Sequence, residues 1–415
     1  MIIYGEKNTR GHVKEWMQRG LISLIVTYGM LFVQLSLVTG QTTGPDVPQF
    51  QVRPGYQVTL AAGDIPNARF LETDSDGTIF VSRPRQGDIL ALRDEDNDGV
   101  YEFRRPFIEG YDTVHGMDYH KGWLWFTQTG AVHKARDADG DGEADKISTV
   151  IPQDRLYSQG GGHWWRSILV TGEALYTSIG DPGNINPDRD TPRKKIWRFN
   201  PDGSGKELFS SGIRNTEKLR ERPGTSEIWG ADHNSDWFGK PLGENRRQQP
   251  ITDMNPPGEF NHYVEGGFYG HPFLVGPKIP RIEYQERKDI IDLAEKTIPP
   301  EWNFGPHWAP NGFTFISPQN THFPEDHRGD AMIAFHGSWN SSVRVGYAIQ
   351  RILFDEHTGD PYGSLRIVTT LHEKNRRVLA RPVDCVETGD GNILFSDDQG
   401  GNIYRITYSG GESGN

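Results

Sequence analysis

Cysteine is nearly absent from this chain of 415 residues, which contains only Cys385. A single thiol excludes an intrachain disulfide, a cysteine-rich zinc site and a CxxCH haem attachment. We expect Cys385 to be a small buried apolar residue. Excess positive charge is also missing, because the formal net charge is −12. This excludes a general electrostatic footprint for nucleic acid, so a bound anion must meet a local basic cluster.

Long apolar runs are confined to the N-terminus, where LISLIVTYGMLFVQLSLV occupies residues 21–38 after a basic flank. This pattern is typical of an export signal. The run is also nearly long enough to span a membrane, so an uncleaved anchor with membrane association stays open. We therefore predict a signal peptide or anchor over residues 1–40 and a linker over 41–51. Either alternative exports the rest of the chain to the periplasm or the cell exterior.

Glycine (49), proline (27) and tryptophan (11) are plentiful, which suits short strands and tight turns. Strand–turn–strand segments begin about 50 residues apart, at Arg69, Val114, His163 and Arg214, and again at His307 and Arg381. Propeller blades repeat every ~40–50 residues with four strands each. We predict an all-β fold, a six-bladed β-propeller over residues 52–410 with inserted loops and a tail at 411–415. Residues 56–62 should close the ring, and 286–296 have helical spacing.

Cationic or titratable side chains stand at the start of every predicted blade. They are Arg69, His115, His163, Arg214, His307 and Arg381. Blade starts converge at one end of a propeller's channel, and core packing does not call for cations there. Guanidinium groups bind carboxylates and phosphates bidentately, so three arginines predict a basic funnel for a small polyanion.

His163 is the candidate general base of this group. Neighbouring arginines disfavour its protonated form, so we expect a neutral ring near pH 7. Asp181 ends the same hairpin and is expected to accept a hydrogen bond from the other ring nitrogen, which would fix the tautomer. A structural histidine is the alternative.

Two acidic loops, residues 94–99 and 137–145, space oxygen ligands at alternate positions before a glycine, as calcium loops do. Neither has the glutamate at position twelve of an EF-hand. The better calcium candidate is the second loop, with Asp137, Asp139, Asp141 and Asp145. Surface turns without a metal are the alternative for both.

An ordered set of segments resembles the sorbosone and glucose dehydrogenases over about residues 52–408. The segments are GGGHWWRSILVTGEALYTSIGD, GIRNTEKL, GADHNSDW, EFNHYVEGGFYGHP, HWAPNGFTFIS, HGSWN and ARPVDCVETGDGNILFSDD. The resemblance implies a six-bladed quinoprotein that uses pyrroloquinoline quinone (PQQ) and calcium to oxidise an aldose, pyranose or sorbosone-like sugar. Without a haem motif, the electrons would pass to an external cytochrome or quinone.

The resemblance also implies roles for single residues, carried over by motif. The implied catalytic pair is His163 with Asp181 as its orienter. The implied cofactor contacts are Arg69, Arg214, Asn215 and Arg381. Main-chain carbonyls of Asn234 and Ser235 would hold calcium, and Trp164 and Trp165 would offer either a sugar platform or rim packing.

The chain departs from the family pattern at four places. Gly-Pro is absent at 234–235, and the family's lysine has no counterpart near HGSWNSS. Val383 replaces a second arginine, and YGHP stands where YGWP is frequent. Two other functions stay open: a calcium-dependent lactonase-type propeller hydrolase, which needs carboxylate and amide ligands around a central metal, and a cofactor-free propeller binding module.

Overall fold

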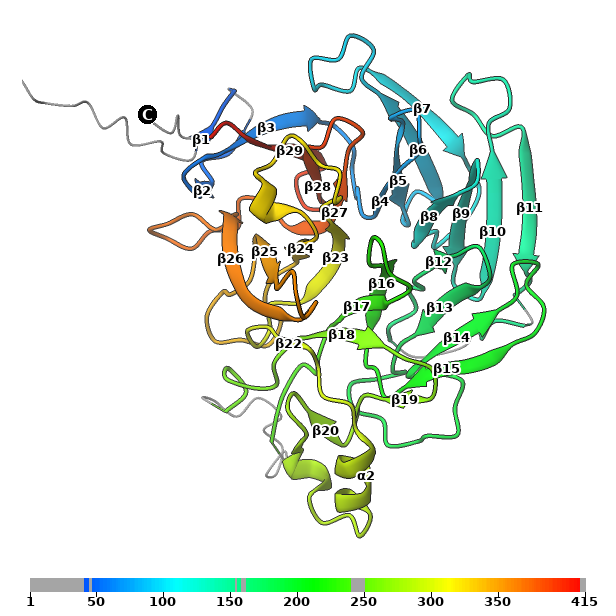
Figure 1. The fold of residues 1–415 in the computed structure, drawn as a ribbon, viewed down its shortest axis with the longest axis vertical. Helices are drawn as coiled ribbons and strands as arrows, with labels where there is room; N and C mark the ends of the chain where they lie inside the picture. The colour runs from blue at the N-terminus through cyan, green and yellow to red at the C-terminus, as the bar shows by residue number, and fades with distance from the viewer. Residues whose placement is uncertain (1–40, 45–46, 154, 158–161, 240–250, 411–415) are drawn as a thin grey trace, which may run out of the picture. The chain divides into compact units, whose positions relative to one another are not determined.

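The computed structural model describes residues 41–44, 47–153, 155–157, 162–239 and 251–410, in which six sheets of four or five strands form the blades (Figure 1). Blade 1 contains β4 (Leu71–Thr73), β5 (Ile79–Arg83), β6 (Asp88–Arg93) and β7 (Phe103–Ile108). Blade 2 contains β8 (Met117–His120), β9 (Trp123–Gln128), β10 (Ala131–Arg136) and β11 (Lys146–Ile151). Blade 3 contains β12 (Leu169–Val170), β13 (Leu175–Ile179), β14 (Lys195–Phe199), β15 (Glu207–Ser211) and β19 (Gly267–Phe268).

The other three blades draw on strands that are more distant in the sequence. Blade 4 contains β16 (Thr216–Glu221), β17 (Ile228–Asp232), β18 (Glu259–Tyr263) and β22 (Trp302–Asn303). Blade 5 contains β23 (Pro310–Phe315), β24 (Ala331–Phe335), β25 (Ala348–Phe354), β26 (Pro361–Thr369) and β2 (Gln51–Val52). Blade 6 contains β27 (Pro382–Glu387), β28 (Ile393–Asp397), β29 (Asn402–Tyr408), β3 (Tyr56–Ala62) and β1 (Gln41–Thr42).

The innermost strands close a ring, because β4, β8, β12, β16, β23 and β27 contact one another in that order and β27 contacts β4. The predicted six-bladed propeller is therefore confirmed. Residues 56–62, which the sequence predicts to close the ring, form β3, and β3 pairs antiparallel with the C-terminal strand β29. In the segment predicted as a linker, β1 pairs with β3, and at its end β2 begins and pairs with β26.

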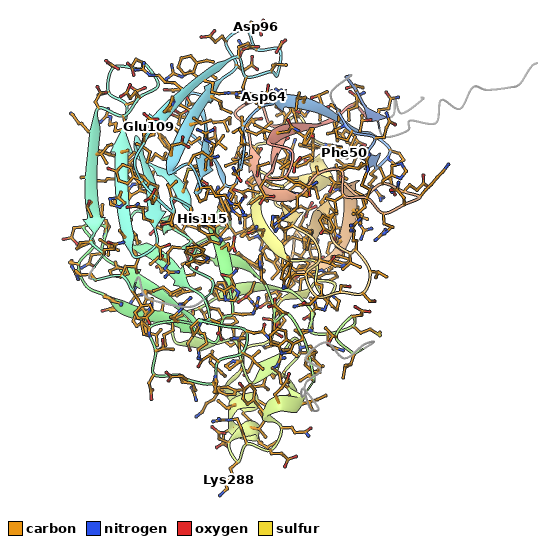
Figure 2. The ribbon with its side chains drawn as sticks, turned by 180° about the vertical axis from the view of Figure 1, so that it is seen from behind. Phe50, Asp64, Asp96, Glu109, His115 and Lys288 are labelled. Carbon is orange, nitrogen blue, oxygen red and sulfur yellow. The ribbon has the colours of Figure 1, made fainter. Side chains whose placement is uncertain are left out.

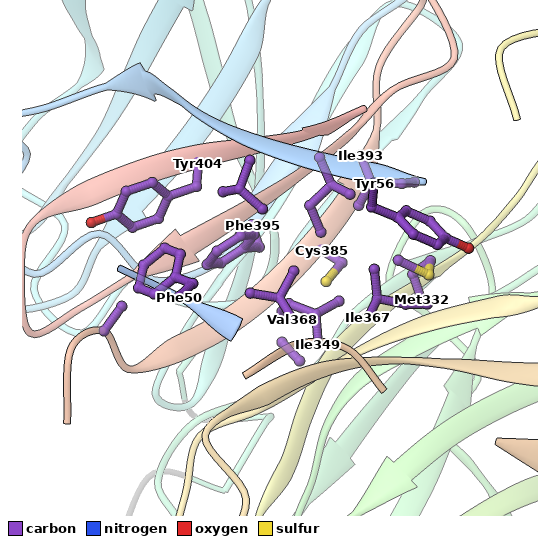
Figure 3. Packing of buried hydrophobic residues seen from close by; sticks show 14 of the residues in the cluster. Phe50, Tyr56, Met332, Ile349, Ile367, Val368, Cys385, Ile393, Phe395 and Tyr404 are labelled. Atoms are coloured by element: carbon purple, nitrogen blue, oxygen red, sulfur yellow. The ribbon is translucent and has the colours of Figure 1, made fainter. Parts of the chain in front are cut away.

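Each blade is held by strand alternation, Asp-Gly turns and packing against the next blade. In the first turn, Asp74 Oδ1 accepts hydrogen bonds from the main-chain N–H groups of Asp76 and Thr78. Gly77 lies between them with φ +90°, a conformation that favours glycine. Blades 5 and 6 pack through a buried apolar cluster around Phe395 (Figure 3). Cys385 lies in this cluster with no exposed surface, as expected.

An insertion within blade 4, between β18 and β22, carries the remaining elements. They are the hairpin β20 (Leu274–Val275) and β21 (Ile279–Pro280), the 3₁₀ helix η1 (Ile282–Tyr284) and the helix α2 (Ile290–Lys296). A second 3₁₀ helix, η2 (Glu325–His327), lies within blade 5. The helix predicted over 286–296 begins only at Ile290, after a turn in which Arg287 and Asp289 form an ion pair.

Within the described ranges, we find no helix that is both long and apolar enough to cross a membrane. The apolar run at 21–38, predicted as an export signal or anchor, lies outside these ranges.

Candidate active site

The side chains predicted to converge stand in the loops before the innermost strands. Arg69, His115, Arg214, His307 and Arg381 directly precede β4, β8, β16, β23 and β27, in that order. His163 is separated from β12 by a longer loop. Figure 2 shows His115 in the interior among the sheets, whereas Asp96 lies on a peripheral loop. The repeat therefore delivers these residues to one end of the ring.

Two adjoining cavities lie among these loops. Arg69 and Arg381 line the larger, which has a volume of about 570 Å³, within the range of small-molecule sites. Arg214 lines the smaller, which has a volume of about 160 Å³. His233 and His336 line both cavities. The three predicted arginines therefore surround one region rather than facing separate surfaces.

Each of the three arginines has a carboxylate partner. The pairs are Arg69–Glu217 (3.1 Å), Arg69–Asp398 (3.0 Å), Arg214–Asp236 (3.1 Å) and Arg381–Asp398 (3.4 Å). The three arginines of the expected basic funnel are thus partly neutralised, and a ligand here meets both positive and negative groups. Glu217 also accepts a hydrogen bond from Asn215 Nδ2 at 2.9 Å. Sequence reasoning missed all three carboxylates, although Glu217 lies in the quoted GIRNTEKL segment.

His163 is held so that one ring nitrogen remains available. Its Nδ1 lies 2.7 Å from the main-chain oxygen of Asp181. A carbonyl oxygen only accepts, so Nδ1 carries the proton and Nε2 is left as an acceptor. Burial, reinforced by the positive charge of Arg214, lowers the pKa of His163 to about 3. The ring is therefore neutral at pH 7.

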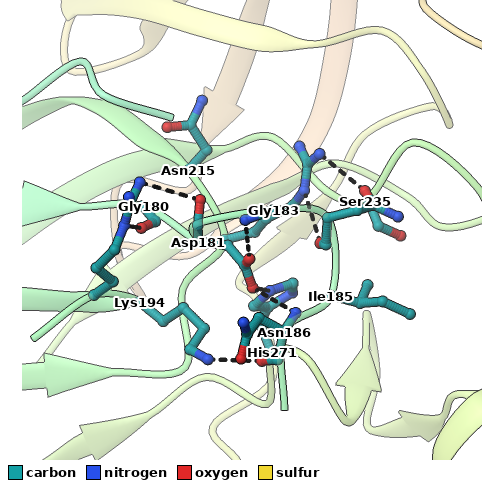
Figure 4. A network of polar contacts seen from close by, with 12 residues as sticks. Gly180, Asp181, Gly183, Ile185, Asn186, Lys194, Asn215, Ser235 and His271 are labelled. Atoms are coloured by element: carbon teal, nitrogen blue, oxygen red, sulfur yellow. Dashed lines mark hydrogen bonds and ion pairs between the residues drawn. The ribbon is translucent and has the colours of Figure 1, made fainter. Parts of the chain in front are cut away.

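Asp181 orients His163 through its main chain, not through the carboxylate as predicted. The carboxylate instead accepts hydrogen bonds from His271 Nε2 (2.8 Å), Gly183 N (2.7 Å) and Asn186 N (3.0 Å) (Figure 4). Burial opposes ionisation of Asp181, but these hydrogen bonds outweigh it and hold its pKa below the usual range. The Asp181 carboxylate therefore holds the loop in place, and the Asp181 carbonyl in that loop accepts the hydrogen bond from His163.

Gly180 permits the close packing around this base. A Cβ atom at position 180 would stand 2.8 Å from His163 Cβ, 2.9 Å from Arg214 O and 2.9 Å from Asn215 Oδ1. These distances are below normal van der Waals contact. Asn215 itself is fixed by a hydrogen bond from its N–H to Asp232 Oδ1 at 2.7 Å.

Asn234 and Ser235 line the smaller cavity beside Arg214. Asn234 Nδ2 donates to Glu259 Oε1 at 3.0 Å, and Ser235 Oγ accepts from Arg281 Nη1 at 2.6 Å. Both side chains therefore hold the loop, and calcium binding by the main-chain carbonyls of Asn234 and Ser235 stays a prediction from the resemblance.

The acidic loops differ from expectation. Carboxylate oxygens of Asp137, Asp139 and Asp145 lie within 4.8 Å of one another. Asp141 does not join them, because Arg105 Nη1 on the neighbouring blade holds its carboxylate at 2.8 Å. The first loop, which the sequence ranks lower, gathers four acidic groups within the same distance: Asp94, Asp96, Asp98 and Glu102.

Several buried polar atoms at the larger cavity lack hydrogen-bond partners among the described residues. They are Arg69 Nε, His233 Nε2 and both amide atoms of Asn311, whose side chain has no exposed surface. Buried polar groups in folded proteins are nearly always hydrogen-bonded. These unpartnered donors and acceptors fit a polar ligand that offers both carboxylate or carbonyl oxygens and hydrogen-bond donors.

Buried ion pairs fill the channel further along β16. Lys218 Nζ lies 2.5 Å from Asp384 Oδ2, and Arg220 lies 2.7 Å from Glu72 and 3.2 Å from Asp118. These pairs join innermost strands of four blades. They tie these innermost strands to one another across the ring.

The fold and this cavity together define a six-bladed β-propeller with a polar cavity among the loops that precede its innermost strands. The chain belongs to the TrAA12-like family, whose family model matches residues 50–409. The kinship expected from the ordered segments is thereby confirmed.

Three solved structures illustrate the similarity of fold. A calcium structure of Trichoderma reesei Carbohydrate-Active Enzymes Family AA12 has a TM-score of 0.74 and 19% identity over 89% of this chain and 100% of that chain. The holo form of the pyranose dehydrogenase PQQ domain from Coprinopsis cinerea has a TM-score of 0.74 and 18% identity, with the same coverage. The apo form of the soluble aldose sugar dehydrogenase from Escherichia coli has a TM-score of 0.58 and 16% identity over 85% and 99%.

An uncharacterized protein of Borreliella burgdorferi is 25% identical over 411 residues, which cover 92% of this chain and 97% of that protein. The likeness therefore extends across nearly the whole of both chains.

Proposed function

We propose that the protein oxidises a hydroxyl or aldehyde group of an aldose, pyranose or sorbosone-like sugar with the help of PQQ and calcium. The observation that carries this proposal is the convergence of Arg69, Arg214 and Arg381 on adjoining cavities with unpartnered polar atoms. PQQ is a flat tricarboxylate, and guanidinium groups bind carboxylates even when partly buried. The PQQ-containing pyranose dehydrogenase domain and the calcium structure among the structural relatives support it.

The residues that would hold the cofactor are Arg69, Arg214, Asn215 and Arg381, and calcium would bind at the main chain of Asn234 and Ser235. When bound, PQQ supplies the hydride acceptor, and calcium polarises its quinone carbonyl. Arg69 and Arg381 share Asp398 as a partner, which holds the two guanidinium groups that would bind the cofactor's carboxylates beside each other.

His163 would take the proton of the reacting sugar hydroxyl at Nε2. Its Nδ1–H is already donated to the Asp181 carbonyl, so the accepting lone pair points away from that contact. A negatively charged cofactor nearby would raise the pKa of His163 from its depressed value and make it a stronger base. Trp165, which stacks on His115 and lies under Arg69, belongs to the cavity wall. Trp164 is 52% exposed and would offer the sugar platform.

A lactonase is less well supported by this cavity. Such an enzyme needs carboxylates free to bind a metal, whereas Glu217 lies against Arg69 and His115, and Asp398 lies against Arg69 and His336. The acidic clusters able to hold a metal among the described residues lie on outer loops instead.

We also propose that the protein acts outside the cytoplasm and passes electrons to an external cytochrome or quinone. The basic flank and apolar run at 21–38 support export, with membrane association if the run is retained. Calcium in the outer loop of Asp137, Asp139 and Asp145 stays a prediction.

Reconstitution tests the proposed function. Purified protein is titrated with PQQ and calcium while absorbance reports cofactor binding, and dye reduction is then measured with a panel of aldoses. We expect turnover that falls at least about 100-fold in His163→Gln and is unchanged in His357→Gln, an exposed histidine remote from the cavity. Lactone hydrolysis without PQQ would establish the lactonase instead, and failure to bind PQQ would overturn the proposal.

A further inference from the structure

Two buried arginines grip the main chain around His163. Arg166 and Arg193 are each only 1% exposed. Arg193 Nη2 donates to the carbonyl of His163 at 3.0 Å, and Arg166 Nη1 donates to the same oxygen at 3.2 Å. One carbonyl therefore receives hydrogen bonds from two guanidinium groups that come from different parts of blade 3.

Arg193 also holds the partner of His163. Its Nη2 donates to the carbonyl of Asp181 at 3.3 Å, and its Nε donates to the carbonyl of Gly180 at 2.7 Å. The Asp181 carbonyl is the oxygen that accepts Nδ1–H of His163. A single guanidinium thus fixes both the base and the group that orients it.

Arg166 holds the same loop from the other side. Besides His163, it donates to the carbonyls of Trp165 (3.1 Å) and Tyr157 (3.0 Å). The hydrogen-bond partners of Arg166 among the described residues are all main-chain carbonyls. Burial, together with the charge of Arg193, lowers the pKa of Arg166 to about 9. Burying two neighbouring cations costs desolvation and repulsion energy. A loop packed by apolar side chains would avoid this cost.

The conformation of His163 explains what the arginines accomplish. Its φ is +51°, in the left-handed region that non-glycine residues rarely adopt. Such residues cluster at functional sites and persist only where the surroundings enforce them. Two guanidinium groups on the carbonyl of His163 provide that enforcement.

We propose that Arg166 and Arg193 are positioning residues for the general base: they hold the main chain of His163 in its left-handed conformation and so fix the direction of Nε2. The inference rests on the proposed function, because it concerns the base of that reaction. It requires no contact between either arginine and the sugar or the cofactor.

The test compares Arg193→Lys and Arg166→Lys with a matched control, Arg351→Lys. Arg351 is a buried arginine on β25, 4% exposed and ion-paired with Asp330 at 2.5 Å. Lysine keeps the charge, but its single nitrogen cannot reach carbonyls on two sides. Melting temperature, PQQ affinity, kcat, KM and the pH profile of kcat/KM are measured for all three variants.

We expect Arg193→Lys to lower kcat about 100-fold, with KM and PQQ affinity changed less than about threefold. The acid limb of the pH profile should move upward by more than one unit, since a loosened His163 regains water. Arg166→Lys should act in the same direction, and Arg351→Lys should lose stability while keeping kcat and the acid limb. An unchanged kcat in Arg193→Lys, or losses that follow melting temperature equally in all variants, would overturn the inference.

Titration of His163 by NMR in the cofactor-free protein separates this inference from the proposed function. The signal is assigned by its loss in His163→Gln. A pKa that rises by more than one unit in Arg193→Lys supports positioning even if PQQ turnover is absent. An unchanged pKa overturns positioning even if the protein proves to be a sugar dehydrogenase.

Discussion

Substituting Gly180 by alanine is the sharpest single perturbation of the candidate site. The added Cβ would lie under 3.0 Å from His163 Cβ, Arg214 O and Asn215 Oδ1. The first two are rigid, since one is a Cβ and the other main chain, so the hairpin end must move. Overpacking of this kind costs about 1–3 kcal/mol.

The expected shifts follow from that cost. With an unfolding entropy of about 2.1 cal/mol/K per residue, 1–3 kcal/mol lowers the melting temperature of a propeller of this length by about 1–4 °C. Activity should fall much further, about 100-fold, because a displacement near 1 Å suffices for that loss. The protein should therefore remain folded and bind PQQ while turnover collapses.

Calorimetry and dye-reduction kinetics measure the two effects in parallel. Gly389→Ala is the matched control, because a Cβ at position 389 meets no atom within 4 Å. Full activity and an unchanged melting temperature in Gly180→Ala would refute the packing described between the hairpin end and the base.

Other predictions follow from burial and charge. Burial lowers the pKa of His233 and His271 to about 4, so below pH 6.5 each binds its proton first in the unfolded chain, and the loss of urea-unfolding stability between pH 6.5 and 4 should be smaller in His271→Gln than in the unaltered protein; identical pH profiles would contradict this. Asn311→Leu should raise the stability of the cofactor-free protein by about 1–3 kcal/mol and weaken PQQ binding at least tenfold in a spectroscopic titration, because it removes two unpartnered polar atoms. Calcium should raise the melting temperature less in Asp96→Asn than in the unaltered protein, whereas Asp141→Asn, whose carboxylate already meets Arg105, should leave that calcium-dependent rise unchanged.

The ring and its closing strand are predictable from sequence because their signals are local. Alternating strands and Asp-Gly turns repeat along the chain, and Tyr56–Ala62 shows the same alternation ahead of the first complete blade. The convergence of Arg69, Arg214 and Arg381 follows from that repeat. The positions of these arginines before the innermost strands can be predicted from the repeat alone, without knowing which carboxylates they pair with.

The charge balance of the cavity is not local, so sequence reasoning misses it. Arg69 meets Glu217 across 148 residues and Asp398 across 329. A similar pairing with Arg105 keeps the carboxylate of Asp141 away from the cluster formed by Asp137, Asp139 and Asp145. Only the folded ring shows which acids stand opposite which bases.

Hydrogen bonds to the main chain are a second kind of contact that sequence patterns do not reveal. The spacing of His163 and Asp181 correctly indicates that the two residues meet. It does not distinguish a carboxylate from a carbonyl, and here the carbonyl makes the contact. The carboxylate of Asp181 instead accepts a hydrogen bond from the imidazole of His271.

The pairing of β3 with β29 sets the order in which a newly made chain can mature. Tyr56 pairs with Tyr408 across this seam, so β3 cannot join its blade before the distant strand β29 has been synthesised. Joining such distant segments carries a loop-closure entropy that grows with separation and delays the final step. Until β29 has been made, β3 lacks the neighbour that joins it to blade 6, and the wall around the central cavity stays incomplete.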